Sequence, residues 1–150
     1  MIRFDDDTAE RLEALLATRP ADEMSVGKLR RACVVAPLIP RRDGWSLLFV
    51  RRSESLALHR GQVAFPGGAA EAGETLEETA VRETEEEVGI PRDAIRLIGR
   101  LDDLHARTGF IVAPFIGIIP PDLEYVLQES EVVETYEVPI SVLLSPPNPE

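Results

Sequence analysis

Cysteine is almost absent from this sequence of 150 residues, because Cys33 is its only one. One cysteine can form neither a disulfide framework nor a thiolate metal site within a single chain. Cys33 lies in an apolar run typical of a strand. We therefore expect a buried, unreactive thiol.

Long apolar runs are also absent. The N-terminal stretch MIRFDDDTAERLEALLATRP contains no apolar signal core. No window of the chain approaches the roughly 20 apolar residues that a membrane span requires. This pattern predicts a protein without a membrane partner, and we expect it to be cytoplasmic.

Basic residues are outnumbered, with 16 Lys and Arg against 27 Asp and Glu and a formal net charge of -11. Nucleic-acid binding usually relies on a basic face, so no nucleic-acid partner is expected. Hydrophobic residues make up 44% of the chain, enough to bury a core, and no internal repeat or low-complexity segment interrupts it. We expect a single domain over residues 1–150.

Acidic residues concentrate in one segment, GGAAEAGETLEETAVRETEEEVGI, which also carries helix start and stop signals. Thr75 followed by Glu78 has the spacing of a capping box. Gly89 tolerates the left-handed conformation that ends many helices, and Pro91 cannot continue one. The pattern predicts a helix over residues 76–88.

The predicted helix carries a cluster of carboxylates near its C-terminal end. At about 100° per residue, Glu83, Glu86 and Glu87 project from one sector of its surface. Because the helix dipole favours cations at this end, each carboxylate in the last turn is unfavourable by roughly 0.3–1 kcal/mol. A hard divalent cation such as Mg²⁺ would reverse the sign of that effect. The cluster therefore predicts a metal site, the alternative being a solvated acidic face.

Apolar and neutral side chains form a separate stripe that can pack on a sheet: Leu76, Ala80, Val81, Thr84 and Val88.

The spacing of charged residues and glycines in this segment resembles the Nudix box of hydrolases that act on nucleoside diphosphates linked to another moiety. The matched positions are Gly68, then after five residues Glu74, then after seven residues Arg82 and Glu83, followed by Glu86, Glu87, Gly89 and Ile90. Thr84 departs from the pattern, since it stands where an aliphatic residue is preferred. The resemblance implies an α/β fold, specifically an α/β/α sandwich with a mixed central sheet, in agreement with the order of predicted elements.

The resemblance also implies a metal-dependent pyrophosphohydrolase. Glu83, Glu86 and Glu87 would hold Mg²⁺ or Mn²⁺, with the carbonyl oxygen of Gly67 as a further ligand. Glu83 is also a candidate to orient or deprotonate the attacking water. In some family members that role belongs to a glutamate on a later loop, and Glu131 is the preferred candidate here.

Four further positions of the box have supporting roles in the resemblance. Arg82 and Glu74 would form an ion pair beside the metal ligands, which places Arg82 among the catalytic residues. Gly68 and Gly89 would permit close backbone approach and helix termination. Glu134 and Glu129 are the alternatives to Glu131, and all three are equally readable as surface charges.

A second resemblance bears on the substrate. The stretch LLFVRRSESLALHRGQVAFPGG is similar to the signature upstream of the box in the coenzyme A pyrophosphatase branch. It departs at Ala57, where the branch has a basic residue, and at Arg60, where a small residue is common. The resemblance implies cleavage of coenzyme A or its thioesters into adenosine 3′,5′-bisphosphate and 4′-phosphopantetheine. The alternatives are hydrolysis of ADP-ribose or a nucleoside triphosphate, and a ligand-sensing domain without turnover.

Coenzyme A carries a 3′-phosphate, which needs cations away from the metal site. The candidate substrate-binding residues are Arg51, Arg52, His59, Arg60 and Arg107. The alternative for each arginine is a solvated charge, and the alternative for His59 is a surface role in a loop. The expected partner is a small nucleoside diphosphate derivative, with a homodimer as the common family assembly. The branch usually continues into a further strand and helix. We therefore expect either a shorter variant or a missing C-terminal segment.

The remaining elements follow from apolar runs and turn residues. Residues 102–109 are predicted as a polar loop, and Pro114 suggests a bulge or an edge position in its strand. The predicted elements are a first helix from Asp7 or Thr8 to Arg19, strands over 30–39, 45–52, 62–65, 94–101, 110–119 and 133–138, and a short helix over 140–144.

Overall fold

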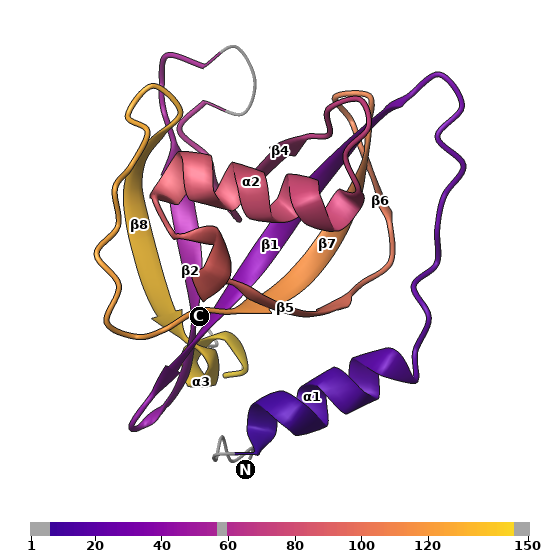
Figure 1. Cartoon of the computed structure of the whole chain (residues 1–150). Helices are drawn as coiled ribbons and strands as arrows, with labels where there is room; N and C mark the ends of the chain where they lie inside the picture. Colours follow the sequence, from indigo (N-terminus) through magenta and orange to yellow (C-terminus); the bar gives the residue numbers. More distant parts are fainter. Residues whose placement is uncertain (1–6, 57–59, 146–150) are drawn as a thin grey trace, which may run out of the picture.

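The computed structural model describes residues 7–56 and 60–145, in which short helices surround one sheet (Figure 1). Among these residues, no helix has the length and apolar character needed to cross a membrane. The helices are α1 (Thr8–Ala17), α2 (Leu76–Val88), the 3-10 helix η1 (Arg92–Ala94) and α3 (Ile140–Leu143). The strands are β1 (Arg30–Arg41), β2 (Gly44–Arg52), β3 (Val63–Ala64), β4 (Gly67–Ala69), β5 (Arg96–Arg100), β6 (Leu104–Ala106), β7 (Phe110–Ile118) and β8 (Val132–Pro139).

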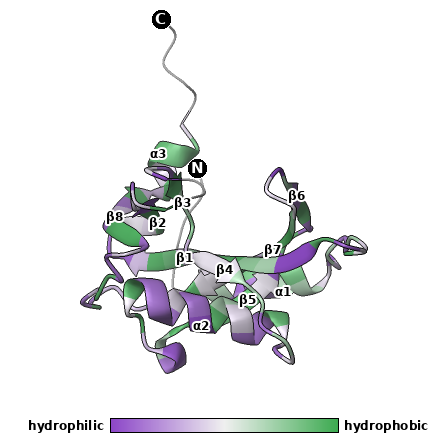
Figure 2. Ribbon diagram, turned by 90° about the horizontal axis from the view of Figure 1, so that it is seen from above, coloured by the Kyte–Doolittle hydropathy of each residue, from purple (hydrophilic) through white to green (hydrophobic). Residues whose placement is uncertain are grey.

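The sheet is mixed and divides along β1. Its central order is β3-β2-β1-β7-β5, while β4 pairs with β1, β6 with β7 and β8 with β2. Only the β1–β7 pair is parallel among the pairs of the described residues. On its other edge β1 pairs first with β4, through residues 32–34, and then with β2, through residues 38–41. Figure 2 shows β2, β3 and β8 on one side of the division and β6 on the other.

Successive β1 side chains point to opposite faces of the sheet, so each face has its own apolar core. On one face, Cys33 and Val35 pack with Ala80 of α2. On the other, Leu38 packs with Ala9 of α1, with Ile140 of α3 partly buried against them. Figure 2 shows α2 and α3 on opposite sides of β1. The predicted α/β fold, with helices on both faces of a mixed sheet, is confirmed.

Helix α2 begins and ends where its capping signals predicted. The Thr75 hydroxyl accepts a hydrogen bond from the Glu78 backbone N–H at 3.1 Å. Gly89 follows the helix with φ of 75°, in the left-handed region that glycine tolerates. Ala80 and Thr84 in the predicted packing stripe are fully buried. The helix is therefore fixed against the sheet, with its carboxylates along the cavity described below.

Two local predictions are wrong. Residues 102–109 contain the short strand β6, which pairs with β7. Pro114 is neither at an edge nor at a bulge, because β7 lies between β1 and β5 and the β1–β7 register runs through Pro114 without a shift. Its carbonyl oxygen accepts a hydrogen bond from Leu101 N at 2.8 Å. Since the N–H and C=O of a strand residue point to the same side, the missing N–H of Pro114 faces the break between β5 and β6, where no ladder bond is lost.

Candidate active site

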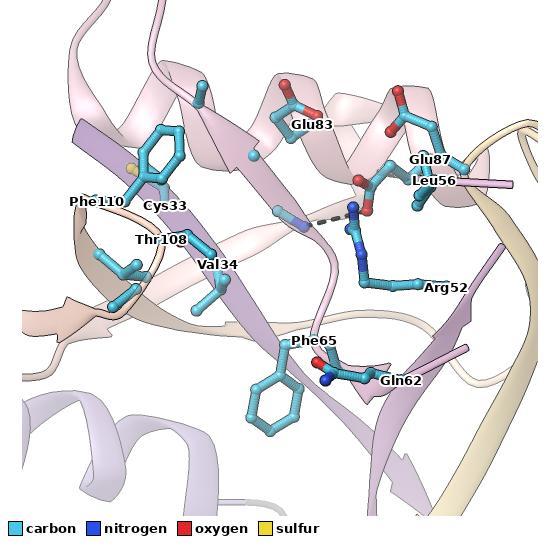
Figure 3. A pocket seen from close by; sticks show the side chains of 18 residues that line it. Cys33, Val34, Arg52, Leu56, Gln62, Phe65, Glu83, Glu87, Thr108 and Phe110 are labelled. Atoms are coloured by element: carbon cyan, nitrogen blue, oxygen red, sulfur yellow. Dashed lines mark hydrogen bonds between the residues drawn. The ribbon is translucent and has the colours of Figure 1, made fainter. Parts of the chain in front are cut away.

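A cavity of about 460 Å³ lies where the sheet divides (Figure 3). Its floor is formed by β1 and β7, and its walls by β4, α2, the β2–β3 region and the turn after β6. Most of the lining is apolar or backbone. The charged side chains among the described lining residues are Arg52, Glu83, Glu87 and Glu131.

The carboxylates of Glu83, Glu87 and Glu131 converge at one end of this cavity. One oxygen from each lies within 4.8 Å of the others. Glu83 and Glu87 are one helical turn apart on α2, and Glu131 precedes β8. Oxygen ligands clustered in this way suit hard divalent cations such as Mg²⁺ or Mn²⁺. The cluster shares Glu83 and Glu87 with the predicted ligand set and has Glu131 where Glu86 was expected.

Backbone hydrogen bonds place Glu131 beside the helix. The Gln128 N–H donates to the carbonyl oxygen of Glu87 at 3.0 Å, one of the terminal helix carbonyls that lack a partner within the helix. Glu131 N donates to the Gln128 carbonyl, and the Glu131 carbonyl accepts from Ser53 N, both at 2.8 Å. The loop before β8 is thus attached both to the end of α2 and to the end of β2.

Arg82 lies behind the carboxylate cluster and makes a bidentate pair with Glu74. The Arg82 Nε–Glu74 Oε2 distance is 2.6 Å and the Nη2–Oε1 distance is 3.0 Å. Arg82 Nη2 also donates to the Ala69 carbonyl at 3.1 Å, and Nη1 donates to Glu83 Oε1 at 3.0 Å. Hydrogen bonding from Arg82 lowers the pKa of Glu74 to about 2. Arg82 therefore connects β4, the box glutamate and a proposed metal ligand.

Glu86 and Glu85 lie at the margin of the site. Glu86 Oε2 accepts from Arg82 Nη1 at 3.2 Å, and its side chain is 49% exposed. Glu86 is adjacent to Glu83 through this shared donor but is outside the converging carboxylates. Glu85 instead accepts from Arg92 Nε at 2.8 Å, which offsets its charge at the end of the helix.

Burial strongly affects the acidity of the cluster. Desolvation raises the pKa of the Glu87 carboxyl, which is 2% exposed, to about 8. Desolvation also raises the pKa of Glu83, although the neighbouring Arg82 opposes that shift. The cluster therefore holds a proton near neutral pH in the absence of a cation. A metal ion that binds these oxygens would release it.

Two glycines of β4 allow the backbone to approach the cluster. Gly67 N donates to Glu87 Oε2 at 3.2 Å. A Cβ atom at Gly68 would overlap the Glu83 carboxyl group, and one at Gly67 would overlap the carbonyl oxygen of Cys33. Gly67 therefore needs to be glycine because backbone atoms fill the space, whereas a side chain at Gly68 would displace the Glu83 carboxylate.

A β-bulge separates the two neighbouring arginines at the end of β2. Arg51 pairs with Glu134 in the β2–β8 register, whereas Arg52 pairs with Val132, so the register shifts between them. Arg51 forms an exposed ion pair with Glu134, with an Nη2–Oε2 distance of 3.2 Å. Arg52 lines the cavity, and its buried Nε has no hydrogen-bond partner among the described residues. Figure 3 shows Arg52 opposite the two glutamates of α2.

The other predicted substrate-binding residues are not brought into the cavity. Arg60 and Arg107 are exposed and do not line it, and His59 is outside the described residues. The lining also includes residues that the sequence did not single out as site residues: Gln62, Phe65, Thr108 and Phe110. Gln62 and Phe65 belong to the upstream signature, which was the available signal. The other two carry no recognisable pattern.

Cys33 also lines the cavity, but its thiol is unreactive. Its thiol donates to the Leu76 carbonyl oxygen at 3.3 Å, and the residue is fully buried. Burial raises its pKa to about 11. Since the thiolate is the reactive form, this thiol is unreactive near neutral pH, as expected.

Comparisons with known proteins agree with this geometry. The NUDIX domain profile matches residues 28–147. The chain is 42% identical over 140 residues to a protein named uncharacterized Nudix hydrolase NudL from Enterobacter sp. (strain 638), covering 93% of this chain and 71% of the relative. A C. elegans Ap4A hydrolase complex is similar in structure, with TM-score 0.64, 16% identity, and 77% and 84% of the two chains covered. A Nudix hydrolase from M. smegmatis, RenU, has TM-score 0.63, 22% identity and 75% and 71% coverage. The chain therefore belongs to the Nudix family and is a Nudix hydrolase.

Proposed function

We propose that this hydrolase cleaves the pyrophosphate bond of coenzyme A or its thioesters, releasing adenosine 3′,5′-bisphosphate and 4′-phosphopantetheine. The observation that carries the proposal is the convergence of Glu83, Glu87 and Glu131 in a cavity that Arg52 also lines, with a buried Nε that has no hydrogen-bond partner among the described residues. The upstream signature, which supplies Arg52 and Gln62 to this cavity, favours coenzyme A among diphosphate substrates.

The diphosphate lies between the carboxylate cluster and Arg52. When bound by these carboxylates, Mg²⁺ or Mn²⁺ supplies positive charge that offsets the charge of the diphosphate and of the leaving oxygen. Arg52 donates hydrogen bonds to phosphate oxygens, for which its planar guanidinium is suited. Arg82 holds Glu83 in place from behind.

Glu131 is the best-placed group to accept a proton from the attacking water. Glu83 already accepts a hydrogen bond from Arg82, and Glu87 accepts one from Gly67 N. Glu131 has the Glu87 carboxyl as a side-chain hydrogen-bond partner but makes no ion pair with a basic residue within the described residues. The water oxygen forms a bond to phosphorus while the bridging P–O bond breaks. The proton of the water passes to the Glu131 carboxylate, and the bridging oxygen leaves with the departing phosphate.

The decisive experiment is product analysis with coenzyme A, dephospho-coenzyme A and ADP-ribose, each with and without Mg²⁺ or Mn²⁺. We expect adenosine 3′,5′-bisphosphate and 4′-phosphopantetheine from coenzyme A only when metal is added. If ADP-ribose is hydrolysed faster than coenzyme A, the protein would instead be assigned as an ADP-ribose pyrophosphatase. A panel extended to nucleoside triphosphates that yields no product would instead favour a ligand-sensing domain.

A further inference from the structure

One row of side chains on β1 extends the cavity floor to a basic residue. Alternate residues of a strand share a face, so Arg30, Ala32 and Val34 lie on the same side of β1. Ala32 and Val34 line the cavity. Arg30 is therefore the next side chain along this face, at the end of the strand where the floor is open to solvent.

A cavity residue holds the Arg30 side chain at this position. Arg30 is paired in register with Phe110, which also lines the cavity. The guanidinium carbon of Arg30 lies 5.0 Å from the centroid of the Phe110 ring, a cation–π distance. The cavity thus ends in an aromatic ring with a guanidinium above it.

The turn between β6 and β7 brings a second arginine to the same end. Arg107 stands between Ala106 and Thr108, which both line the cavity. The turn is tied to β1 by the hydrogen bond from Arg30 N to the Gly109 carbonyl oxygen at 3.2 Å. Arg107 and Arg30 are both exposed and lie on adjacent backbone segments.

These two arginines differ from their neighbours in charge pairing. Arg31, on the opposite face of β1, donates to the buried Asp103 carboxylate at 2.7 Å, and Arg100 donates to the same group at 2.7 Å. Within the described residues, neither Arg30 nor Arg107 forms an ion pair with a carboxylate. In a chain of net charge -11, two arginines without acidic partners beside a cavity are suited to an anionic ligand.

The distance along β1 between Arg30 and the carboxylate cluster indicates which group of the ligand an anion at Arg30 would be. Gly68, whose Cα lies beside the Glu83 carboxyl, pairs in register with Cys33. Arg30 is three residues earlier on β1, which corresponds to roughly 10 Å at about 3.3 Å per residue. An anion at Arg30 therefore belongs to a different group from the diphosphate at the carboxylates, on the same ligand.

We infer that Arg30, together with Arg107, forms a second anion subsite that binds the phosphate monoester at the adenosine end of the substrate, with the adenosine near Phe110. This inference rests on the proposed function and extends it. It assigns recognition of the 3′-phosphate to the start of β1 and the β6–β7 turn. Arg51, already paired with Glu134, does not contribute.

Kinetics with coenzyme A and dephospho-coenzyme A in Mg²⁺ test the subsite, because these substrates differ only in the 3′-phosphate. In Arg30→Ala we expect KM for coenzyme A to rise about tenfold, the size of a lost charge-assisted hydrogen bond, with kcat retained. Values for dephospho-coenzyme A should not change. Arg107→Ala should act in the same direction. Arg42→Ala, which removes the same charge from the exposed β1–β2 turn, is the control and should alter neither substrate.

An equal effect of Arg30→Ala on both substrates, or no effect on either, would overturn the assignment. A binding measurement tests the second anion subsite independently of the proposed hydrolysis. The wild-type protein should bind adenosine 3′,5′-bisphosphate more tightly than AMP, and Arg30→Ala should remove that difference. If coenzyme A is not hydrolysed but this difference is found, the proposed function fails and the subsite stands. If the wild-type protein binds both nucleotides equally, the subsite is wrong.

Discussion

Arg82 and Glu74 form a bidentate ion pair, with distances of 2.6 Å from Nε to Oε2 and 3.0 Å from Nη2 to Oε1. The remaining donor, Nη1, is thereby directed at Glu83. We predict that Arg82→Lys lowers kcat/KM about 10- to 100-fold, because a lysine ammonium cannot maintain the bidentate pair and also support Glu83. Steady-state kinetics measure kcat/KM, and thermal shift on titration with Mg²⁺ measures the affinity for the metal.

Arg92→Lys is the matched control for this substitution. Arg92 also bonds a glutamate of α2, since its Nε lies 2.8 Å from Glu85 Oε1, but its side chain is 57% exposed and does not line the cavity. Exposed pairs contribute little to stability, so activity and Mg²⁺ affinity should remain near wild type. Similar losses in both variants would show that Arg82 has no particular role in placing Glu83.

Adjacent arginines at the β2 bulge should respond differently to truncation. Arg52→Ala removes a cavity guanidinium and should raise KM for a diphosphate substrate about 10- to 100-fold. Arg51→Ala removes only the outward ion pair with Glu134 and should leave KM unchanged. Michaelis constants for both variants at saturating Mg²⁺ give the comparison. A larger effect at Arg51 would contradict the position of the bulge.

Sequence patterns were most successful where local chemistry determines structure. Helix α2 was predicted to the residue, because the Thr75 cap and the Gly89 terminus act over a few neighbouring residues. Strand β6 was missed, since three residues in a polar context form a strand only through pairing with β7. The edge assignment of Pro114 failed for a related reason. The break between β5 and β6 that accommodates it is a feature of the assembled sheet.

The sequence identified candidate site residues but did not show which of them lie close together in space. Glu131 was one of three late glutamates, and only the attachment of its loop to α2 and to Ser53 brings it beside Glu87. Arg51 and Arg52 were equivalent as sequence candidates, because the face that each occupies depends on the bulge. Their functional roles, and that of Glu86, stay predictions.

The close contact between Gly68 and Glu83 gives a third prediction. In Gly68→Ala the new methyl group would overlap the Glu83 carboxyl, so the carboxylate must move. We expect activity to fall about 100-fold, as displacement of a catalytic group by about 1 Å can cause, and Mg²⁺ affinity to fall with it. Gly117→Ala is the control, since its Cβ would approach Val35 Cγ1 at 3.1 Å within the core and away from the cluster. That variant should change the melting temperature without a specific loss of Mg²⁺ affinity.

The buried Glu87 carboxyl should make the stability of the metal-free protein depend on pH. Burial raises its pKa from 4.5 to about 8, so the folded state binds this proton more tightly than the unfolded state. Its contribution to stability is therefore fully present below about pH 4.5 and is lost as pH rises towards 8. The pKa of Glu74 is shifted the other way, to about 2, so that group adds an opposite slope near pH 4.5, which fades as the pH rises further.

Replacing Glu87 by Gln isolates this effect, because the amide cannot ionise. We predict that the melting temperature of the metal-free wild-type protein falls between about pH 4.5 and about pH 8, with a shallower fall in Glu87→Gln. At pH 8, Mg²⁺ should raise the melting temperature of the wild type by binding only the folded state, and should have little effect on the variant. Glu85→Gln, at an exposed paired glutamate of the same helix, should retain both the wild-type slope and the response to Mg²⁺.

Parallel pH profiles for the wild type and Glu87→Gln would mean that this carboxyl is not the protonated group. Stabilisation of Glu87→Gln by Mg²⁺ equal to that of the wild type would remove Glu87 from the metal ligands.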